Sequence, residues 1–464
     1  MERGERARRI HFIGIGGSSL SGLASMALDA GHRVSGSDRA GGHKTDALAA
    51  RGAEVIIGHA PERVRGADLV VYSAAIPKGD PELAYAAASG IPVMGRAEYL
   101  GRLMGACEES ICVSGTHGKT TASAMAATVF IAAGEDPTVH IGGELPSIGG
   151  GSLRGGDRYF IAEACEFDRS FLKMRPTAVA ILNIDFDHPD TYLDLDETEA
   201  AFLAFARMTP KGGFVAGWGD DPRVTRVLAA CGRDTRTFGL GPSCELRAEG
   251  LSEDGAGGIR FEATLFGHPL AEVSLPVPGE HNVIDALAAL ALADRFELSA
   301  SGAAEALASF TGVKRRFERT SVTDGAAVYQ DYAHNPAEIR CALSNARKAT
   351  GGRVIAVWQP HTYSRTKRLF EDFLGCFGEA DELLVTDICG AREADPGDIH
   401  SADLVGALRA RGIPARLTPS FDDAEAALRG VWRAGDLAIT LGCGDIDRLN
   451  DRIAERGDTV SFIM

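Results

Sequence analysis

The sequence GTHGKTT at residues 115–121 follows an apolar run at 110–114 and precedes a helical pattern over 120–133. Glycines let backbone N–H groups approach an anion closely, and the N-terminus of the next helix adds partial positive charge. A Lys in such a loop reaches outer phosphates, and a Thr hydroxyl can ligate Mg²⁺. Because Val113 stands where a strict phosphate loop has Gly, we interpret the stretch as a shortened phosphate loop. The alternative is a glycine-rich turn with an exposed Lys.

Short apolar runs typical of strands alternate with helical stretches along the whole chain, and the alternation restarts near residues 110 and 319. We expect strands over 10–15, 33–37, 54–57, 69–72 and 92–94, then over 110–114, 159–163 and 178–183, and finally over 327–332, 353–359, 382–387 and 437–441. Helices are expected over 20–30, 120–133, 282–296, 337–349 and 366–377. Residues 240–280 have the alternation of antiparallel strands.

This organisation predicts an α/β fold of three domains, which agrees with about 150 residues per domain in a 464-residue chain. We expect a Rossmann-like N-terminal domain over 1–106, a central P-loop-type α/β domain over 107–317 and a Rossmann-like C-terminal domain over 318–464.

Composition excludes several classes of protein. Lys and Arg total 48 against 64 Asp and Glu, a net charge of −16, which argues against a general binder of nucleic acid or anionic membranes. The nine cysteines cannot all pair internally, and no Cys/His cluster has zinc spacing. No apolar run reaches the roughly 20 residues that span a bilayer. These features predict a soluble cytoplasmic protein.

A second glycine loop opens the chain, with Gly14, Gly16, Gly17 and Ser18 after the first expected strand. It is a broken dinucleotide fingerprint, because its sixth position is Ser19 instead of Gly or Ala. Asp38 ends the second expected strand, where an acid would meet a ribose hydroxyl. Diphosphate at this loop fits NAD and UDP alike, and a Rossmann turn without a specific ligand is the remaining alternative.

The GTHGKTT loop resembles the ATP loop of the Mur ligases, which build the peptide of bacterial cell-wall precursors. Further motifs occur in the order of that family and cover nearly the whole chain: EACE at 163–166, NIDFDHPDTY at 183–192, GEHN at 279–282, GVKRRFE at 312–318, DYAHNP at 331–336, QPHTYSRT at 359–366 and GCGDI at 442–446. The first loop, the RRFE and QPHTYSRT stretches, and TDI at 386–388 are similar to the alanine-adding branch, although Ser19-Leu20 stands where Gly-Met is more common.

The resemblance implies an ADP-forming ligase that joins L-alanine to UDP-N-acetylmuramate through an acyl phosphate and uses ATP and Mg²⁺. It implies a uridine-nucleotide domain, an ATPase domain and a domain for the amino acid, in a monomer or homodimer. No Lys lies between His188 and Lys211, which fits the alanine-adding branch because several relatives carry a carbamylated Lys there.

The resemblance also assigns site residues. Residues expected at ATP are Gly115, Thr116, His117, Gly118, Lys119, Thr120, Thr121, Asn282, Arg316 and Asp331. Those expected at the UDP-sugar are Gly14, Gly16, Gly17, Ser18, Asp38 and Ser73. Tyr332, His334 and Arg365 are expected at the amino acid, and Thr120, Glu163 and His188 at metal. The catalytic set is Lys119, His188, His334 and Arg365.

Several alternatives stay open at the level of sequence. Asn282 fits a helix N-cap as well as an adenine contact, Arg315-Arg316 fits a solvated pair, and His361 fits a buried hydrogen-bonded histidine. Glu166 is a less certain metal ligand than Glu163. A related ligase that adds another amino acid or recycles a tripeptide, an NAD oxidoreductase and a non-catalytic nucleotide-binding protein are the competing functions.

Overall fold

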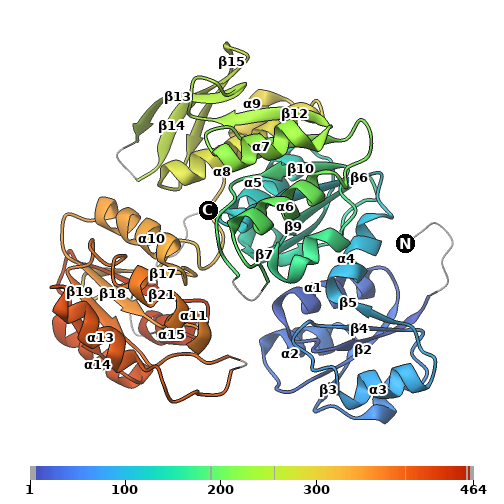
Figure 1. The fold of residues 1–464 in the computed structure, drawn as a ribbon, viewed down its shortest axis with the longest axis horizontal. Coiled ribbons are helices and arrows are strands. Elements are labelled where there is room, and N and C mark those ends of the chain that lie inside the picture. The colour runs from blue at the N-terminus through green and yellow to red at the C-terminus, as the bar shows by residue number, and fades with distance from the viewer. Residues whose placement is uncertain (1–6, 189–190, 255–256, 392, 456–457, 460–464) are drawn as a thin grey trace. The chain divides into compact units, whose positions relative to one another are not determined.

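A computed structural model describes residues 7–188, 191–254, 257–391, 393–455 and 458–459 of the chain. These residues form three β-sheets and two compact units, Met1–Thr311 and Gly312–Met464 (Figure 1). The first unit contains two of the sheets and the second unit contains one. The expected three-domain α/β fold is confirmed, while the boundaries at 106 and 317 stay predictions.

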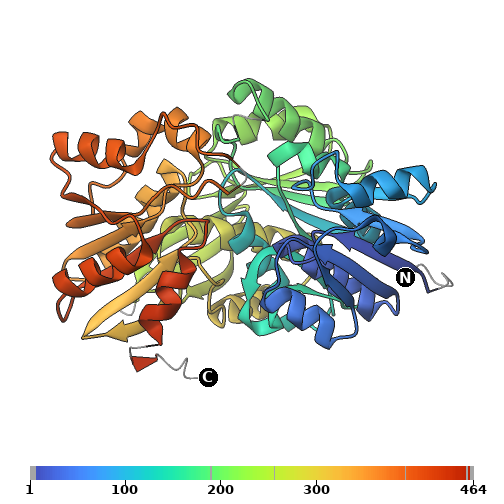
Figure 2. The same ribbon diagram turned by 90° about the horizontal axis from the view of Figure 1, so that it is seen from below.

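The first sheet is parallel throughout, with strand order β3-β2-β1-β4-β5. Its strands are β1 (Arg9–Ile13), β2 (Arg33–Asp38), β3 (Glu54–Ile57), β4 (Leu69–Tyr72) and β5 (Val93–Gly95). Its helices are α1 (Ser18–Asp29), α2 (His43–Ala50), α3 (Pro81–Ala88) and α4 (Arg96–Met104), with a 3₁₀ turn at Pro61–Val64. Apolar runs such as LVVY in β4 are buried because helices cover both faces of the sheet, as Figure 2 shows.

The strand order of this sheet reverses between β1 and β4, and parallel α/β sheets bind ligands outside such a reversal. The loop after β1 carries Gly14–Ser18, and the loop after β4 carries Ser73. The two loops therefore meet at the carboxyl edge of the sheet.

The second sheet has ten strands in the order β15-β14-β13-β12-β11-β10-β6-β9-β7-β8. They are β6 (Glu109–Ser114), β7 (Thr138–Leu145), β8 (Gly150–Leu153), β9 (Tyr159–Ala164), β10 (Ala178–Ile181), β11 (Phe214–Trp218), β12 (Asp234–Gly239), β13 (Leu246–Glu253), β14 (Ile259–Leu265) and β15 (His268–Leu275). The helices are α5 (Lys119–Ala132), α6 (Leu195–Ala206), α7 (Pro222–Cys231), α8 (Glu280–Arg295) and α9 (Ala300–Ala308), with 3₁₀ turns at Pro146–Ile148 and Phe167–Lys173. Strands β13, β14 and β15 are antiparallel, which confirms the expectation for 240–280.

The third sheet has the order β20-β19-β18-β21-β17-β16-β22. Its strands are β16 (Glu318–Thr323), β17 (Ala326–Asp331), β18 (Val354–Trp358), β19 (Glu382–Val385), β20 (Ala415–Leu417), β21 (Leu437–Leu441) and β22 (Asp458–Thr459). Its helices are α10 (Pro336–Ala349), α11 (Tyr363–Arg368), α12 (Phe370–Phe373), α13 (Ser401–Ala410), α14 (Phe421–Val431) and α15 (Asp447–Ala454).

The predicted continuous helix over 366–377 is wrong. The backbone bends at Leu369, which has φ −99° and ψ 19°, so that α11 and α12 are separate short helices. The second helix ends before Gly375, whose N–H donates to the carbonyl of Asp372. Glycine favours a helix end here because it has a low helix propensity.

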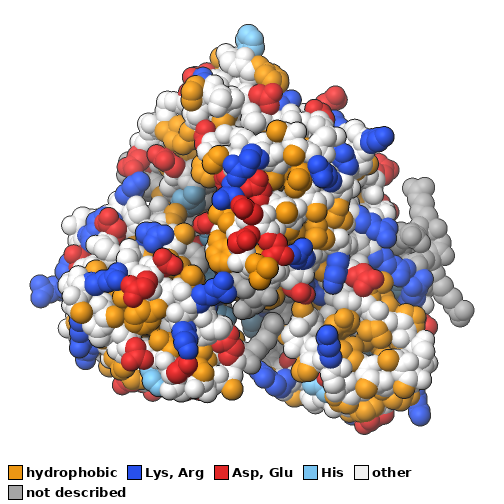
Figure 3. All heavy atoms as spheres, in the orientation of Figure 1, with side chains coloured by type: hydrophobic (Ala, Val, Ile, Leu, Met, Phe, Trp, Pro, Cys, Tyr) orange, Lys and Arg blue, Asp and Glu red, His pale blue; other side chains and the backbone are white. Residues whose placement is uncertain are grey.

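One continuous set of buried apolar residues extends from the first sheet into the second. In it, the Phe171 ring stacks on Phe205 at 4.6 Å between centroids and meets Phe202 edge-on at 5.3 Å. On the viewed face, Lys and Arg side chains are scattered among Asp and Glu (Figure 3). No helix in the described part of the chain is long and apolar enough to cross a membrane.

We predict that Phe171→Ala lowers the free energy of unfolding by about 3–5 kcal/mol, because it removes a fully buried ring and leaves a cavity. Urea denaturation of the full chain measures the loss. Phe266→Ala is the matched control, since that ring is 59% exposed and its removal opens no cavity. Equal losses for the two variants would contradict the packing described.

Candidate functional site

The loop over 115–118 joins β6 to α5 in a conformation that requires glycine. Gly118 precedes the helix with φ 82°, in the left-handed region. A Cβ atom on Gly118 would lie 2.6 Å from Oδ1 of Asp285, which α8 brings against the start of α5. Only glycine fits this close approach, and Gly118 itself is exposed, while the first N–H groups of α5 lack partners within the helix.

Asn183, at the end of the segment after β10, holds this loop in place. The His117 N–H donates to Asn183 Oδ1 at 2.8 Å, and Asn183 Nδ2 donates to the His117 carbonyl at 3.1 Å. The Thr116 N–H donates to the Asn183 carbonyl at 3.1 Å. Strands β6 and β10 pair in parallel with Ser114 opposite Ile181, so the loop and Asn183 leave the sheet at the same edge. Sequence reasoning assigned Asn183 no role, although a polar residue directly after a buried strand was the available signal.

Lys119 lies at the first turn of α5 with its ammonium turned toward the loop. Nζ donates to the carbonyls of Gly115 at 2.6 Å and Thr116 at 2.8 Å, and it lies 3.0 Å from Glu166 Oε2. Burial acts to lower the Lys119 pKa, but the acidic neighbours together, with Glu166 foremost and Glu163 further off, outweigh it and raise that pKa. Lys119 is therefore a permanent cation inside the loop.

Thr120 and Glu163 form a second polar contact beside the loop. Thr120 Oγ1 donates to Glu163 Oε2 at 2.8 Å, and the Gly142 N–H donates to the same carboxylate oxygen at 2.7 Å. Hydroxyl and carboxylate oxygens are the ligands that Mg²⁺ prefers. The pair brings together two of the three predicted metal ligands, and its donor set fits that ion.

The third predicted ligand, His188, lies beside a different carboxylate. His188 Nε2 is 3.5 Å from Glu166 Oε1, and ligand atoms of Cys165, Glu166 and His188 lie within 4.8 Å of one another. Glu166 is 1% exposed and contacts Lys119 on its other side. Burial acts to raise the Glu166 pKa, but the Lys119 charge and the contact with His188 together outweigh it, so that pKa is lowered. The sequence underrated Glu166 because it cannot show that this side chain lies between Lys119 and His188.

The alternative that Asn282 is the N-cap of a helix is wrong. Helix α8 begins at Glu280 with Gly279 as its N-cap, and Asn282 is within the first turn. Its Nδ2 donates to the Pro278 carbonyl at 2.5 Å, which anchors the preceding turn. The adenine contact of Asn282 stays a prediction.

A side-chain hydrogen bond also holds the first glycine loop in place. The carboxylate of Asp38 accepts the Gly16 N–H at 2.8 Å, so this acid holds the loop after β1 against the end of β2. A Cβ on Gly14, which has φ 83°, would lie 3.4 Å from Cβ of Ser73. The structure thus brings the predicted UDP-sugar residues of three strand ends together, while their ligand contacts stay predictions.

A histidine–carboxylate cluster lies at the same edge of the first sheet. His59 Nδ1 is 3.2 Å from Asp80 Oδ2 and 3.4 Å from Glu82 Oε2. Glu82 also accepts from Ser37 Oγ and from the Ala60 N–H, and Asp80 caps α3. Because these oxygens already have donors, we interpret the cluster as a hydrogen-bonded support for the loop after β3.

In the second unit, Asp331 and Tyr332 lie at the end of β17. The carboxylate of Asp331 accepts the N–H groups of Phe317 and Ala333, each at 2.7 Å, and burial raises its pKa to about 6. The guanidinium groups of Arg315 and Arg316 lie 4.9 and 5.1 Å from the centre of the Tyr332 ring. These contacts make the segment a rigid polar turn, and Arg315 is built into it instead of being a solvated residue.

His334 and Arg365 lie near the loop that follows β21. His334 Nδ1 is 3.2 Å from Glu338 Oε2, and its ring meets Tyr332 edge-on at 5.6 Å. Burial raises the pKa of Cys443, a residue of that loop, to about 12, while the charge of Arg365 acts to lower it and that of Glu338 to raise it. Tyr332 and His334 are therefore in contact, and Arg365 acts electrostatically on the neighbouring loop; the roles of all three at the amino acid stay predictions.

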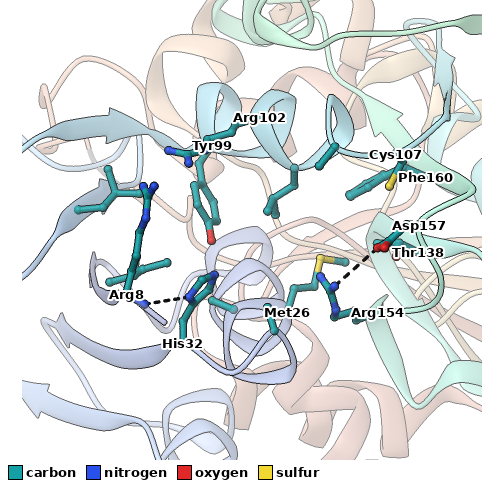
Figure 4. Close-up of a pocket in the computed structure, with 16 residues that line it drawn as sticks. Arg8, Met26, His32, Tyr99, Arg102, Cys107, Thr138, Arg154, Asp157 and Phe160 are labelled. Atoms are coloured by element: carbon teal, nitrogen blue, oxygen red, sulfur yellow. Dashed lines mark hydrogen bonds and ion pairs between the residues drawn. The ribbon is translucent and has the colours of Figure 1, made fainter. Parts of the chain in front are cut away.

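A cavity of about 70 Å³ lies in the first unit, lined by side chains from α1, α4 and β9. Figure 4 shows Met26, Tyr99 and Phe160 on its walls and the ion pair between Arg154 and Asp157, 3.8 Å, at one side. Lining residues precede β1 and follow α1, at the edge of the sheet opposite the glycine loop. The cavity is therefore separate from the candidate site.

Comparison with known families matches three models in succession along the chain. They are described as Mur ligase family, catalytic domain, over residues 9–107; Mur ligase middle domain, over 113–293; and Mur ligase, glutamate ligase domain, over 315–444.

Similar proteins cover almost the full length. The UDP-N-acetylmuramate–L-alanine ligase of Clostridium beijerinckii is 42% identical over 442 residues, which is 95% of this chain and 96% of that relative. The ligase of the same name from Caldanaerobacter subterraneus is 40% identical over 97% of this chain and 98% of that relative. The crystal structure of UDP-N-acetylmuramate-alanine ligase from Thermotoga maritima superposes with a TM-score of 0.83 at 27% identity, covering 97% of this chain and 99% of that one.

We predict that Asn183→Ala loosens the 115–118 loop, because the N–H and carbonyl of His117 both lose their partner. Unfolding free energy should fall by about 1–3 kcal/mol, and amide exchange at His117, followed by mass spectrometry, should accelerate. Asn183→Asp keeps the acceptor but not the donor. Its unfolding free energy and its exchange rate at His117 should lie between those of the unmodified chain and those of the Ala variant. Unchanged exchange at His117 in the Ala variant would contradict the clamp.

Proposed function

Because this chain belongs to the Mur ligase family, we propose that it is an ATP-dependent ligase that joins L-alanine to the carboxylate of UDP-N-acetylmuramate. The observation that carries the proposal is the GTHGKTT loop, in which Lys119 and the Thr120–Glu163 pair converge on the start of α5. Relatives about 40% identical over nearly their whole length, which bear the name of this ligase, support the choice of alanine.

The first step makes a poor acylating group into a good one. A carboxylate oxygen of the sugar attacks the γ-phosphorus of ATP, the bond to the β-phosphate oxygen breaks, and ADP leaves with an acyl phosphate formed. This transfer concentrates negative charge, which fixed cations and N–H donors stabilise when they are already in place. Lys119 and the N–H groups at the start of α5 supply that stabilisation.

In the second step the alanine nitrogen attacks the acyl carbon. The carbon–oxygen bond to phosphate breaks, inorganic phosphate leaves, and the nitrogen loses a proton. Arg365 would hold the alanine carboxylate, because its planar donor fork matches two oxygens. His334, beside Glu338, would orient the amine or accept the proton.

Mg²⁺ would neutralise phosphate charge when bound. Thr120 and Glu163 fit it through a hydroxyl and a carboxylate that already touch, and Glu166 with His188 offers a second set of donors. Because Glu166 also neutralises Lys119, we propose it as a positioning group for both the loop lysine and His188.

The uridine nucleotide would bind at the first sheet. Gly14, Gly16, Gly17 and Ser18 would meet its diphosphate at the start of α1, with Ser73 alongside. Asp38, which fastens Gly16, would meet the ribose. In the second unit, Asp331 and Arg316 would contact ATP.

The direct test is release of inorganic phosphate from the full chain with ATP, Mg²⁺ and UDP-N-acetylmuramate, offered each amino acid in turn and one tripeptide. Alanine should give the highest kcat/KM together with an amide product seen by mass spectrometry. A preference for the tripeptide would assign the chain to a recycling ligase. No ATP consumption with any acceptor would overturn the ligase proposal.

We predict that Lys119→Ala lowers kcat on the order of 10³-fold, because a preorganised cation is lost from the phosphate loop. Binding of UDP-N-acetylmuramate, measured by calorimetry, should change little, since its loop belongs to a different sheet. Lys211→Ala removes an exposed lysine of the same unit and serves as the control. Loss of turnover together with loss of UDP-N-acetylmuramate binding would show that the assignment of the two loops is wrong.

We predict that Arg365→Ala raises the KM for alanine roughly 10- to 100-fold, because a charge-assisted hydrogen bond is lost. The KM for ATP should stay within about twofold, because Arg365 is assigned to the amino acid and the effects of separate sites are independent. Steady-state kinetics with each substrate varied measures both. Lys367→Ala is the control, since that side chain is 61% exposed. An unchanged KM for alanine would remove Arg365 from the amino-acid pocket.

A further inference from the structure

Two basic side chains that the sequence did not single out lie at the start of α1. Lys44 Nζ, from α2, donates to Ser18 Oγ at 2.9 Å. Arg96 Nη1, from the first residue of α4, donates to Ser19 Oγ at 3.2 Å. Two consecutive serines of the first glycine loop thus each hold a cation from a different helix.

Neither cation is neutralised locally. Within the described residues, Lys44 and Arg96 each have a serine hydroxyl as polar partner. Neither has a carboxylate oxygen within 4.0 Å, the distance at which an ion pair would form. The first turn of α1 contains no acidic residue and no side-chain cap. Asp38, the nearby acid of the loop, is engaged by the N–H groups of Gly16 and Ala40. Two positive charges and the positive end of a helix therefore gather where backbone N–H groups point outward.

Hydrogen-bond direction fixes the position of Arg96. A guanidinium can only donate, so Ser19 Oγ accepts from it and uses its own hydrogen elsewhere. His140 Nε2 lies 2.8 Å from Ser19 Oγ and takes that hydrogen, which leaves His140 Nδ1–H to donate to Ser152 Oγ at 2.8 Å. This series of hydrogen bonds requires the His140 imidazole to be neutral. Burial, helped by the Arg96 charge, lowers the His140 pKa to about 3 and keeps the ring neutral.

We propose that Lys44 and Arg96 are cationic ligands of the diphosphate of the UDP-sugar, and that His140 positions Arg96 through Ser19. This inference rests on the proposed function. The diphosphate fits because its two negative charges lie on adjacent phosphorus atoms. The two cations lie in a matching way at adjacent serines, Ser18 and Ser19. Arginine adds a planar fork that matches phosphate oxygens, and lysine adds a mobile point charge.

The test is calorimetric titration of the full chain with four probes: UDP-N-acetylmuramate, UDP-N-acetylglucosamine, UDP and uridine. In Lys44→Gln and Arg96→Gln, we expect Kd for the three diphosphates to rise roughly 10- to 100-fold each, as expected for hydrogen bonds to charged groups. Uridine and ATP should bind as they do to the unmodified chain. Arg51→Gln and Arg102→Gln remove equal charge from the far ends of the same two helices and serve as controls.

Each outcome decides the assignment. A loss confined to UDP-N-acetylmuramate would overturn it, because the cations would then bind the sugar's carboxylate, which UDP-N-acetylglucosamine lacks. Equal losses in the two control variants would overturn it in favour of a general charge effect. If the unmodified chain binds UDP-sugars and consumes ATP with alanine while both variants bind UDP normally, only this inference fails. If the unmodified chain binds no uridine nucleotide, the proposed function fails with it.

His140 needs a readout that simple destabilisation would not move. His140→Leu should raise the KM for UDP-N-acetylmuramate by a larger factor than it lowers kcat, with the KM for ATP unchanged. His140→Gln should restore part of the loss, because an amide can accept from one hydroxyl and donate to another. An unchanged KM for the UDP-sugar in a folded Leu variant would overturn the positioning role.

Discussion

The buried ion pair between Lys119 and Glu166 is the interaction on which the central site depends. Glu166 is 1% exposed, so its charge is tolerated only because the lysine and His188 lie against it. Removing either charge of such a pair leaves the other uncompensated, which costs more than the pair gains. The same carboxylate thus fixes the lysine of the phosphate loop and the histidine of a distant segment. That dual contact explains why Glu166, which the sequence offered only as a less certain metal ligand, belongs to the site.

The two glycine loops of the first unit solve the same electrostatic problem in different ways. The GTHGKTT loop carries its cation within itself, and Lys119 is held by carbonyls of its own turn. The loop after β1 has no basic residue, and its cations come from α2 and α4. A triphosphate that must react gains from a cation that is fixed to the loop. In the proposed function, a diphosphate that only anchors its sugar would be served by cations that converge from neighbouring elements.

Sequence reasoning predicted what is local. The strand–loop–helix at 110–133, the alternation of the three sheets and the antiparallel block at 240–280 all follow from periodicity and glycine placement, and the structure contains them. It failed where a boundary depends on one backbone angle, as at Leu369, or where a glycine just upstream takes the capping position, as Gly279 does ahead of Asn282. Contacts between distant segments were beyond its reach. Asn183 on the loop, Glu166 beside His188 and Arg96 on Ser19 are separated by 22 to 77 residues, and only the folded sheet brings them together.

Strand β7 gives the first unit a physical connection between its two nucleotide loops. Its His140 accepts from Ser19 of the first loop, and two residues later its Gly142 N–H donates to Glu163, which holds Thr120 of the second loop. Side-chain and backbone groups of one strand are fixed relative to each other by its pairing with β8 and β9. The register of β7 therefore sets the distance between the loops, since a shift by one residue would turn His140 to the other face of the sheet. A single strand, absent from the sequence prediction, thus connects the two nucleotide loops of the proposed reaction that this unit contains.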